Sequence, residues 1–147
     1  MSQGVYYLIA VGVGVALIFQ VGMNVTLRGA LASPMVAALV SFLVGSLALL
    51  LFVLASGAHW PARAQLSAVP AWAWFGGVLG AVYVASSIVL GPRLGAATLL
   101  ALIVLGQLLA SLVLDHYGLL GFAQYPLSVT RLVGALLLFG GVLLIVR

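Results

Sequence analysis

Residues 34–56 read PMVAALVSFLVGSLALLLFVLAS and contain no charged side chain. A helical run of about 20 apolar residues is long enough to cross the ~30 Å hydrocarbon core of a bilayer. The rest of the chain has a similar composition, since 66% of its 147 residues are hydrophobic and 4% are charged. A soluble domain carries about 25% charged residues. The sequence therefore predicts an integral membrane protein whose exterior faces lipid.

Polar and helix-breaking residues divide the chain into five apolar runs. We predict transmembrane helices near 5–27, 34–56, 70–90, 94–114 and 129–146, forming a single transmembrane domain. Continuous apolar runs favour helices, because the strands of a membrane barrel alternate in polarity over about ten residues. Pro34 and Pro92 lie where a helix can begin without losing an internal hydrogen bond. The predicted fold class is all-α, with five transmembrane helices per chain.

The positive charges are distributed almost evenly between the two membrane faces. Five spans place the termini on opposite faces, so Arg63, Arg131 and the amino group oppose Arg28, Arg93 and Arg147. Orientation in the membrane follows an imbalance of arginine and lysine between the faces. The balance found here favours insertion in both directions. We expect the chain to pair with itself as an antiparallel homodimer, with a paralogous partner as the alternative, and to bind no nucleic acid.

Polar side chains inside the spans are the candidate substrate-binding residues, because an unsatisfied polar group in lipid costs several kcal/mol. Six such residues are predicted to bind substrate: Gln20, Asn24, Tyr83, Ser87, Gln107 and Ser111. Each amide either forms a hydrogen bond to a neighbouring helix or lines a cavity. All six side chains are neutral. If they line a cavity, we expect that cavity to accept a neutral or zwitterionic solute.

The spacing of these residues groups them on helix faces. Gln20 and Asn24 stand four residues apart, as do Gln107 and Ser111, and residues at this spacing share one face of a helix. Tyr83 combines an aromatic wall with one polar tip, which suits an amphipathic ligand. Gln107 is the most central amide of the chain.

A second polar group lies at the membrane interface. Asp115 ends the fourth span, His116 follows it, and Arg131 begins the fifth span on the same face. The acid and the imidazole are candidates for proton coupling, because histidine changes its charge near neutral pH. The alternative is a structural ion pair between Asp115 and Arg131 that clamps the loop.

Several kinds of chemistry find no support in the sequence. The chain has no cysteine, and its two histidines and single acid lie outside the apolar runs. No metal-binding cluster, nucleophile triad or phosphate-binding glycine loop is present. We therefore expect no cofactor, no metal site and no enzymatic activity.

The order of several motifs resembles the YdcZ-like branch of the drug/metabolite transporter superfamily, whose members have five helices. The resemblance rests on Gln20-Val-Gly-Met-Asn24, Ser33-Pro34, Gly76-Gly77, Gly80-Ala81, Pro92-Arg93-Leu94-Gly95, Gly106-Gln107, Asp115-His116-Tyr117-Gly118 and Gly140-Gly141. It covers essentially the whole chain. The polar family positions present here are Gln20, Asn24, Gln107 and Asp115. Unlike the four-helix small multidrug resistance proteins, the chain has no acid in its first helix, which argues against proton-coupled cation export.

This resemblance implies a multi-pass protein of the bacterial inner membrane. It also implies that two antiparallel chains form a ten-helix bundle with a cavity near the bilayer midplane. We expect an alternating-access exporter of a small or amphipathic metabolite. The alternatives are an accessory membrane subunit without transport activity, and a lipid-translocating protein.

Overall fold

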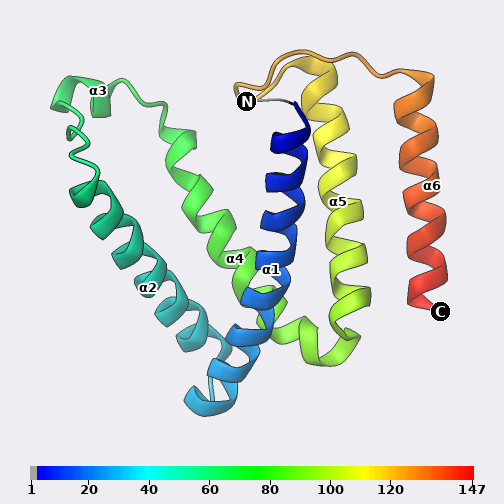
Figure 1. Cartoon of the computed structure of the whole chain (residues 1–147), viewed down its shortest axis with the longest axis horizontal. Coiled ribbons are helices and arrows are strands. Elements are labelled where there is room, and N and C mark those ends of the chain that lie inside the picture. Colours follow the sequence, from blue (N-terminus) through cyan, green and yellow to red (C-terminus); the bar gives the residue numbers. More distant parts are fainter. Residues whose placement is uncertain (1–2) are drawn as a thin grey trace. The chain divides into compact units, whose positions relative to one another are not determined.

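The computed structural model describes residues 3–147, which are almost entirely helical. The elements are α1 (Gln3–Leu31), α2 (Pro34–Ala55), α3 (Arg63–Ser67), the 3₁₀ helix η1 (Ala71–Phe75), α4 (Gly76–Leu94), α5 (Ala96–Tyr117) and α6 (Val129–Val146), shown in Figure 1. Among these residues, five helical segments are long and apolar enough to cross a membrane. The prediction of an all-α chain with five such spans is confirmed.

The chain forms two compact units, with a boundary between Pro92 and Arg93. In the first unit, α1 and α2 pack against each other as an antiparallel hairpin, and α1 crosses α4 near the end of each helix (Figure 1). In the second unit, α5 and α6 lie side by side and antiparallel. Our expectation of a single transmembrane domain stays a prediction.

Serine caps define where two of the spans begin. The Ser33 hydroxyl accepts a hydrogen bond from the backbone N–H of Val36 at 3.3 Å, and Pro34 follows as the first helical residue. The Ser128 hydroxyl accepts from the N–H of Arg131 at the same distance and starts α6. Each cap satisfies an N–H that has no partner inside the helix. The beginnings predicted at 34 and 129 follow from these caps.

Several of the predicted boundaries differ from the structure, including the end of the fourth span, which continues past residue 114 to Tyr117. The first helix continues past residue 27 to Leu31 and ends at Ala32, whose φ is 54°. The third predicted span, 70–90, corresponds to η1 followed by α4. Helix α4 begins at Gly76, after the 3₁₀ turn, and continues past residue 90 to Leu94. Pro92 thus lies inside the last turn of α4, and our assignment of Pro92 to the start of the next helix was wrong. The next helix, α5, starts after Gly95, whose φ of 79° interrupts the helical conformation.

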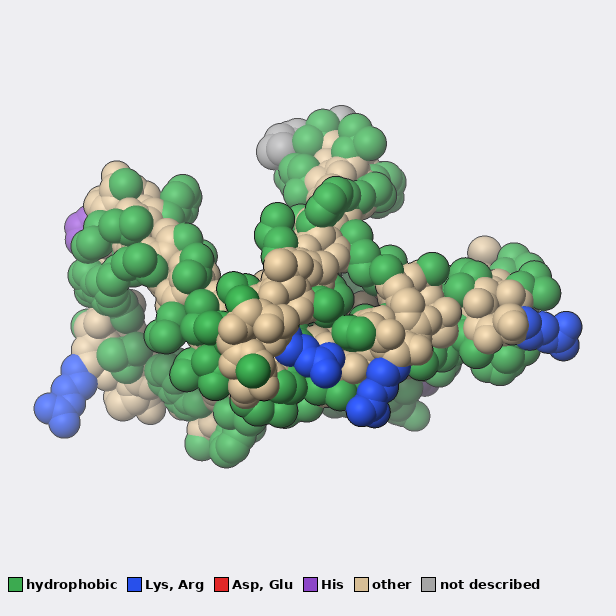
Figure 2. Space-filling model, turned by 90° about the horizontal axis from the view of Figure 1, so that it is seen from below, with side chains coloured by type: hydrophobic (Ala, Val, Ile, Leu, Met, Phe, Trp, Pro, Cys, Tyr) green, Lys and Arg blue, Asp and Glu red, His purple; other side chains and the backbone are tan. Residues whose placement is uncertain are grey.

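Very little of the chain is buried within itself. The first unit has a small core of Ala37 and Ala38 from α2 with Val84 and Ile88 from α4. In the most apolar window of each span, between 11% and 17% of the residues are buried. Hydrophobic side chains cover most of the face shown in Figure 2, and arginine side chains appear at separate points. Such a surface requires lipid or another protein around it.

Candidate functional site

The polar face of α1 contributes Gln20 and Asn24. The Gln20 side chain is exposed, whereas Asn24 is one of the few buried polar residues, with 3% of its surface accessible. Within residues 3–147 neither amide forms a hydrogen bond, and no fully buried side-chain N or O atom lacks a partner, so the amide atoms of Asn24 stay accessible. An asparagine held in this way retains unused donors and an unused acceptor. The binding of substrate by this face of α1 stays a prediction.

The middle of α4 contributes Tyr83 and Ser87. The Ser87 hydroxyl is buried and donates to the carbonyl oxygen of Tyr83 at 2.8 Å. This bond within one helix is the usual way for serine to satisfy its hydroxyl in an apolar setting. The Tyr83 side chain is half-buried against the core formed by α2 and α4. Ser87 is thus buried and satisfied within its own helix, and the half-buried Tyr83 is the more accessible of the two predicted residues.

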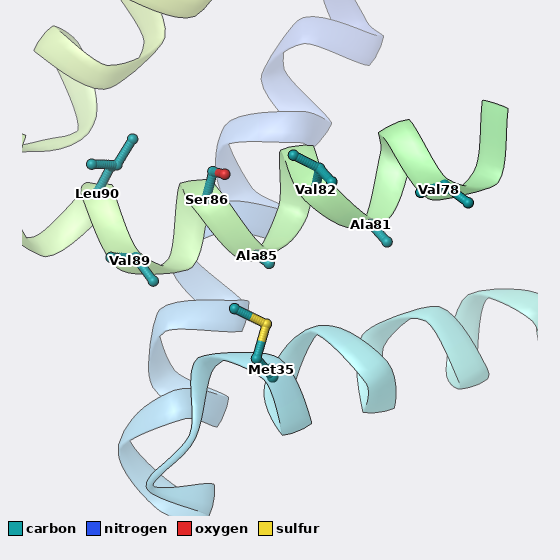
Figure 3. Close-up of a pocket in the computed structure, with 8 residues that line it drawn as sticks. All are labelled: Met35, Val78, Ala81, Val82, Ala85, Ser86, Val89 and Leu90. Atoms are coloured by element: carbon teal, nitrogen blue, oxygen red, sulfur yellow. The ribbon is translucent and has the colours of Figure 1, made fainter. Parts of the chain in front are cut away.

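An apolar groove lies between the first turn of α2 and one side of α4. It encloses about 490 Å³ and is lined by Met35, Val78, Ala81, Val82, Ala85, Ser86, Val89 and Leu90. Figure 3 shows Met35 reaching from α2 toward α4, and Ser86 is the one polar residue of the lining. None of the six predicted substrate-binding residues lines this groove. Ser86, the exposed neighbour of Ser87, was not among the predicted residues, because the burial of each serine depends on how α4 packs against α2.

The second unit contributes Gln107 and Ser111 from α5. Both side chains are exposed, and the Ser111 hydroxyl donates to the carbonyl oxygen of Leu108 at 2.9 Å. The Gln107 amide has no hydrogen-bond partner in the described part of the chain. A central amide without a partner inside its own chain must find one elsewhere, in another protein surface, in water or in a ligand.

The end of α5 is joined to α6 by an ion pair. Arg131 Nη2 donates to Asp115 Oδ2 at 2.9 Å, and Arg131 Nη1 donates to the carbonyl oxygen of Tyr125 at 3.1 Å. The backbone N–H of Tyr125 donates in turn to the carbonyl oxygen of Asp115 at 2.7 Å. The loop after α5 is thus folded back on the helix that precedes it, as expected for a clamp.

His116 belongs to the same clamp. Its Nδ1 atom accepts from the backbone N–H of Leu127 at 3.1 Å, and its carbonyl oxygen accepts from Gln124 Nε2 at 3.0 Å. Both the ring and the backbone of His116 are therefore tied to the loop that precedes α6. The residues described here contain no group of three metal-binding side chains. The ion pair expected between Asp115 and Arg131 is present, and the proton coupling proposed for Asp115 and His116 stays a prediction.

One polar contact was not anticipated by the sequence analysis. Arg28, which we assigned to the membrane interface, donates from Nη1 to the carbonyl oxygen of Ile88 at 3.1 Å. The two residues are 60 positions apart in the sequence. Pro92, four residues after Ile88, could have indicated the need for this contact, because proline has no N–H to donate to the Ile88 carbonyl.

Residues 5–144 match the model of a family described as "Putative inner membrane exporter, YdcZ". The chain belongs to the YdcZ family. No curated protein and no solved structure matches it. Membership in the YdcZ family together with five membrane-spanning segments identifies a multi-pass protein of the inner membrane, as predicted. The description of the YdcZ family names an inner-membrane exporter, which groups the chain with transporters.

Proposed function

We propose that this YdcZ-family chain exports a small neutral or zwitterionic metabolite by alternating access, as an antiparallel homodimer. The observation that carries the proposal is the exposed, partnerless amide of Gln107 in the middle of a membrane span. Intramembrane polar groups usually face a bundle interior or a water-filled cavity. A second copy of the chain would supply that interior, and a polar solute would supply hydrogen bonds to the amide.

The open glycine positions on the helices support self-association. A Cβ atom added at Gly22, Gly106, Gly134 or Gly140 would meet nothing within 4 Å. Small residues on membrane helices let two backbones approach closely, and they are enriched at helix–helix interfaces. The near-balance of positive charge on the two faces favours an antiparallel pair. A dimer of this kind would bring the polar residues of two copies around one interior.

The neutral character of the deep polar residues supports the cargo class. Gln20, Asn24, Tyr83 and Gln107 carry no charge, and the single acid, Asp115, is already paired with Arg131. A net charge on the solute would therefore enter an apolar region without a compensating group, which is costly. Neutral and zwitterionic solutes avoid that cost or cancel it internally.

Export is tested with liposomes that contain the purified protein. They are loaded with a defined mixture of neutral, zwitterionic, anionic and cationic amphipathic solutes, and the loss of each is followed by mass spectrometry. We expect selective loss of neutral or zwitterionic solutes relative to protein-free liposomes. A dye-labelled lipid reports on lipid translocation in parallel. Release of no solute by an intact dimer would contradict the proposal, and translocation of the lipid alone would identify a lipid-translocating protein.

The antiparallel arrangement is tested by labelling single cysteines in a chain that has none of its own. Gln3→Cys and, separately, a cysteine added after Arg147 are exposed to a membrane-impermeant maleimide before and after vesicles are permeabilised. Because the two faces are balanced in charge, we expect about half of each site to react before permeabilisation. Complete reaction at one terminus and none at the other would show a fixed orientation. That outcome would require an oppositely oriented paralogous partner or an accessory role.

A further inference from the structure

The last turn of α4 lacks one of its backbone hydrogen bonds. Pro92 has no N–H, so the carbonyl oxygen of Ile88, four residues earlier, cannot receive the bond that continues the helix. Ile88 is completely buried, with 0% of its surface accessible. A buried carbonyl without a donor costs free energy on the scale of a lost hydrogen bond. The sequence therefore creates a local need for a donor at this point of α4.

Arg28 of α1 meets that need. Its Nη1 atom lies 3.1 Å from the carbonyl oxygen of Ile88. A guanidinium has several N–H donors, so it can satisfy this carbonyl while its other donors remain directed elsewhere. The charge also suits the place, because the C-terminal end of a helix carries a partial negative charge. The contact connects two helices that bear different parts of the candidate site in the first unit.

The surrounding core strengthens the connection. Leu27, the neighbour of Arg28, packs against the core that contains Val84 and Ile88 of α4. The hydrogen bond and this packing hold α1 against α4 at the point where the two helices cross (Figure 1). Above the crossing, α1 carries Gln20 and Asn24, and α4 carries Tyr83 and Ser87.

We propose that Arg28 is a positioning residue: it replaces the donor that Pro92 removes from α4, and so fixes the polar faces of α1 and α4 relative to each other. An effect of Arg28 on transport rests on the proposed function, whereas its role in holding α1 against α4 does not. Arg93 provides the contrast, since its side chain is exposed and has no hydrogen-bond partner within residues 3–147. An arginine that served only as an interface anchor would behave like Arg93.

The replacement of the missing donor is tested by a double-mutant cycle on the purified full-length protein. Arg28→Met is expected to lower the midpoint of thermal unfolding by on the order of 5 °C. In a Pro92→Ala background the restored N–H at position 92 serves the Ile88 carbonyl, so Arg28→Met should lower the midpoint by less than half as much. Arg93→Met is the matched control and should have little effect. Equal losses from Arg28→Met in the two backgrounds would overturn the capping role.

The positioning role is tested by a distance measurement that does not depend on transport. Spin labels on Met23→Cys and Val82→Cys, both exposed positions, report the separation of α1 and α4, with dilution by unlabelled protein to remove distances between copies. We expect a narrow distribution in the parent protein, a broad one in Arg28→Met, and recovery in Arg28→Lys, which keeps a charged donor. Arg93→Met should stay narrow. A narrow distribution in Arg28→Met would overturn the proposal.

The effect on transport separates this inference from the proposed function. A solute released by the parent protein should be released several times more slowly by Arg28→Met and at nearly the parent rate by Arg28→Lys. Unchanged release by Arg28→Met would overturn the positioning role in transport. If the parent protein releases no solute, the proposed function fails, and the unfolding cycle and the distances still decide the role of Arg28.

Discussion

Gln107→Leu is expected to lower solute efflux from proteoliposomes by roughly tenfold or more, while the dimer remains folded. The Gln107 amide is exposed in the middle of α5 and has no partner in the described part of its own chain. If it hydrogen-bonds the solute during transport, leucine leaves a polar group of the solute unpaired in an apolar interior. Such an unpaired group costs about 1–3 kcal/mol, which corresponds to a change of roughly fivefold to more than a hundredfold.

A matched control separates this effect from a general loss of glutamine. Gln65→Leu makes the same chemical change outside the spans, where Gln65 Oε1 accepts from the backbone N–H of Ala62 at 2.8 Å. It should leave efflux close to the parent rate. Gln107→Asn keeps the amide on a shorter side chain and should retain part of the activity. Efflux and the fraction of dimer are measured on the same preparation.

The competing role for Gln107 is a hydrogen bond between helices, worth roughly 0.6–2 kcal/mol in a membrane. In that case leucine would weaken the dimer, and each remaining dimer would transport at the parent rate. A fall in dimer fraction with unchanged efflux per dimer would therefore contradict a role in solute binding. The two readings of this residue that the sequence left open are thus separated by one pair of measurements.

The spans could be predicted because they depend on local properties. The length of each apolar run and the Ser-Pro pair at residues 33–34 are visible in the sequence, and the last span was placed at 129–146, where α6 is found. The end of α4 depends on a distant residue. A proline in the last turn is tolerated because Arg28 supplies the donor, and nothing local to Pro92 reveals an arginine that lies far away along the chain.

The candidate site shows the same division between local and distant information. Asp115 and Arg131 could be paired from the sequence, because they stand at facing ends of consecutive helices. The folding of the loop back onto α5 could not be predicted. It depends on hydrogen bonds from the backbone N–H groups of Tyr125 and Leu127, and the types of the side chains do not indicate such bonds. The meeting of Gln107 with the polar face of α1 stays a prediction, because these residues belong to different units.

Gly118→Ala is expected to destabilise the second unit by about 2–3 kcal/mol. Gly118 ends α5 in the left-handed conformation, with φ of 63°, and Leu119 N–H donates to the carbonyl oxygen of Leu114 at 2.9 Å. This arrangement satisfies an otherwise free carbonyl at the helix end. A Cβ at Gly118 would also lie 3.2 Å from the Cβ of Gln124, inside the loop that forms the clamp. Alanine therefore meets backbone strain and a steric contact together.

Gly57→Ala isolates the first of these two effects. Gly57 has a φ of 64°, almost identical to that of Gly118, but a Cβ there would meet nothing within 4 Å. Backbone strain alone should cost about 1 kcal/mol at Gly57. The difference between the two variants in denaturant unfolding measures the contact with Gln124, which holds His116 through its side-chain amide. Equal losses would mean that the loop moves away from the added methyl group without cost, and the loop would then be too loose to hold Asp115 and Arg131 in a fixed ion pair.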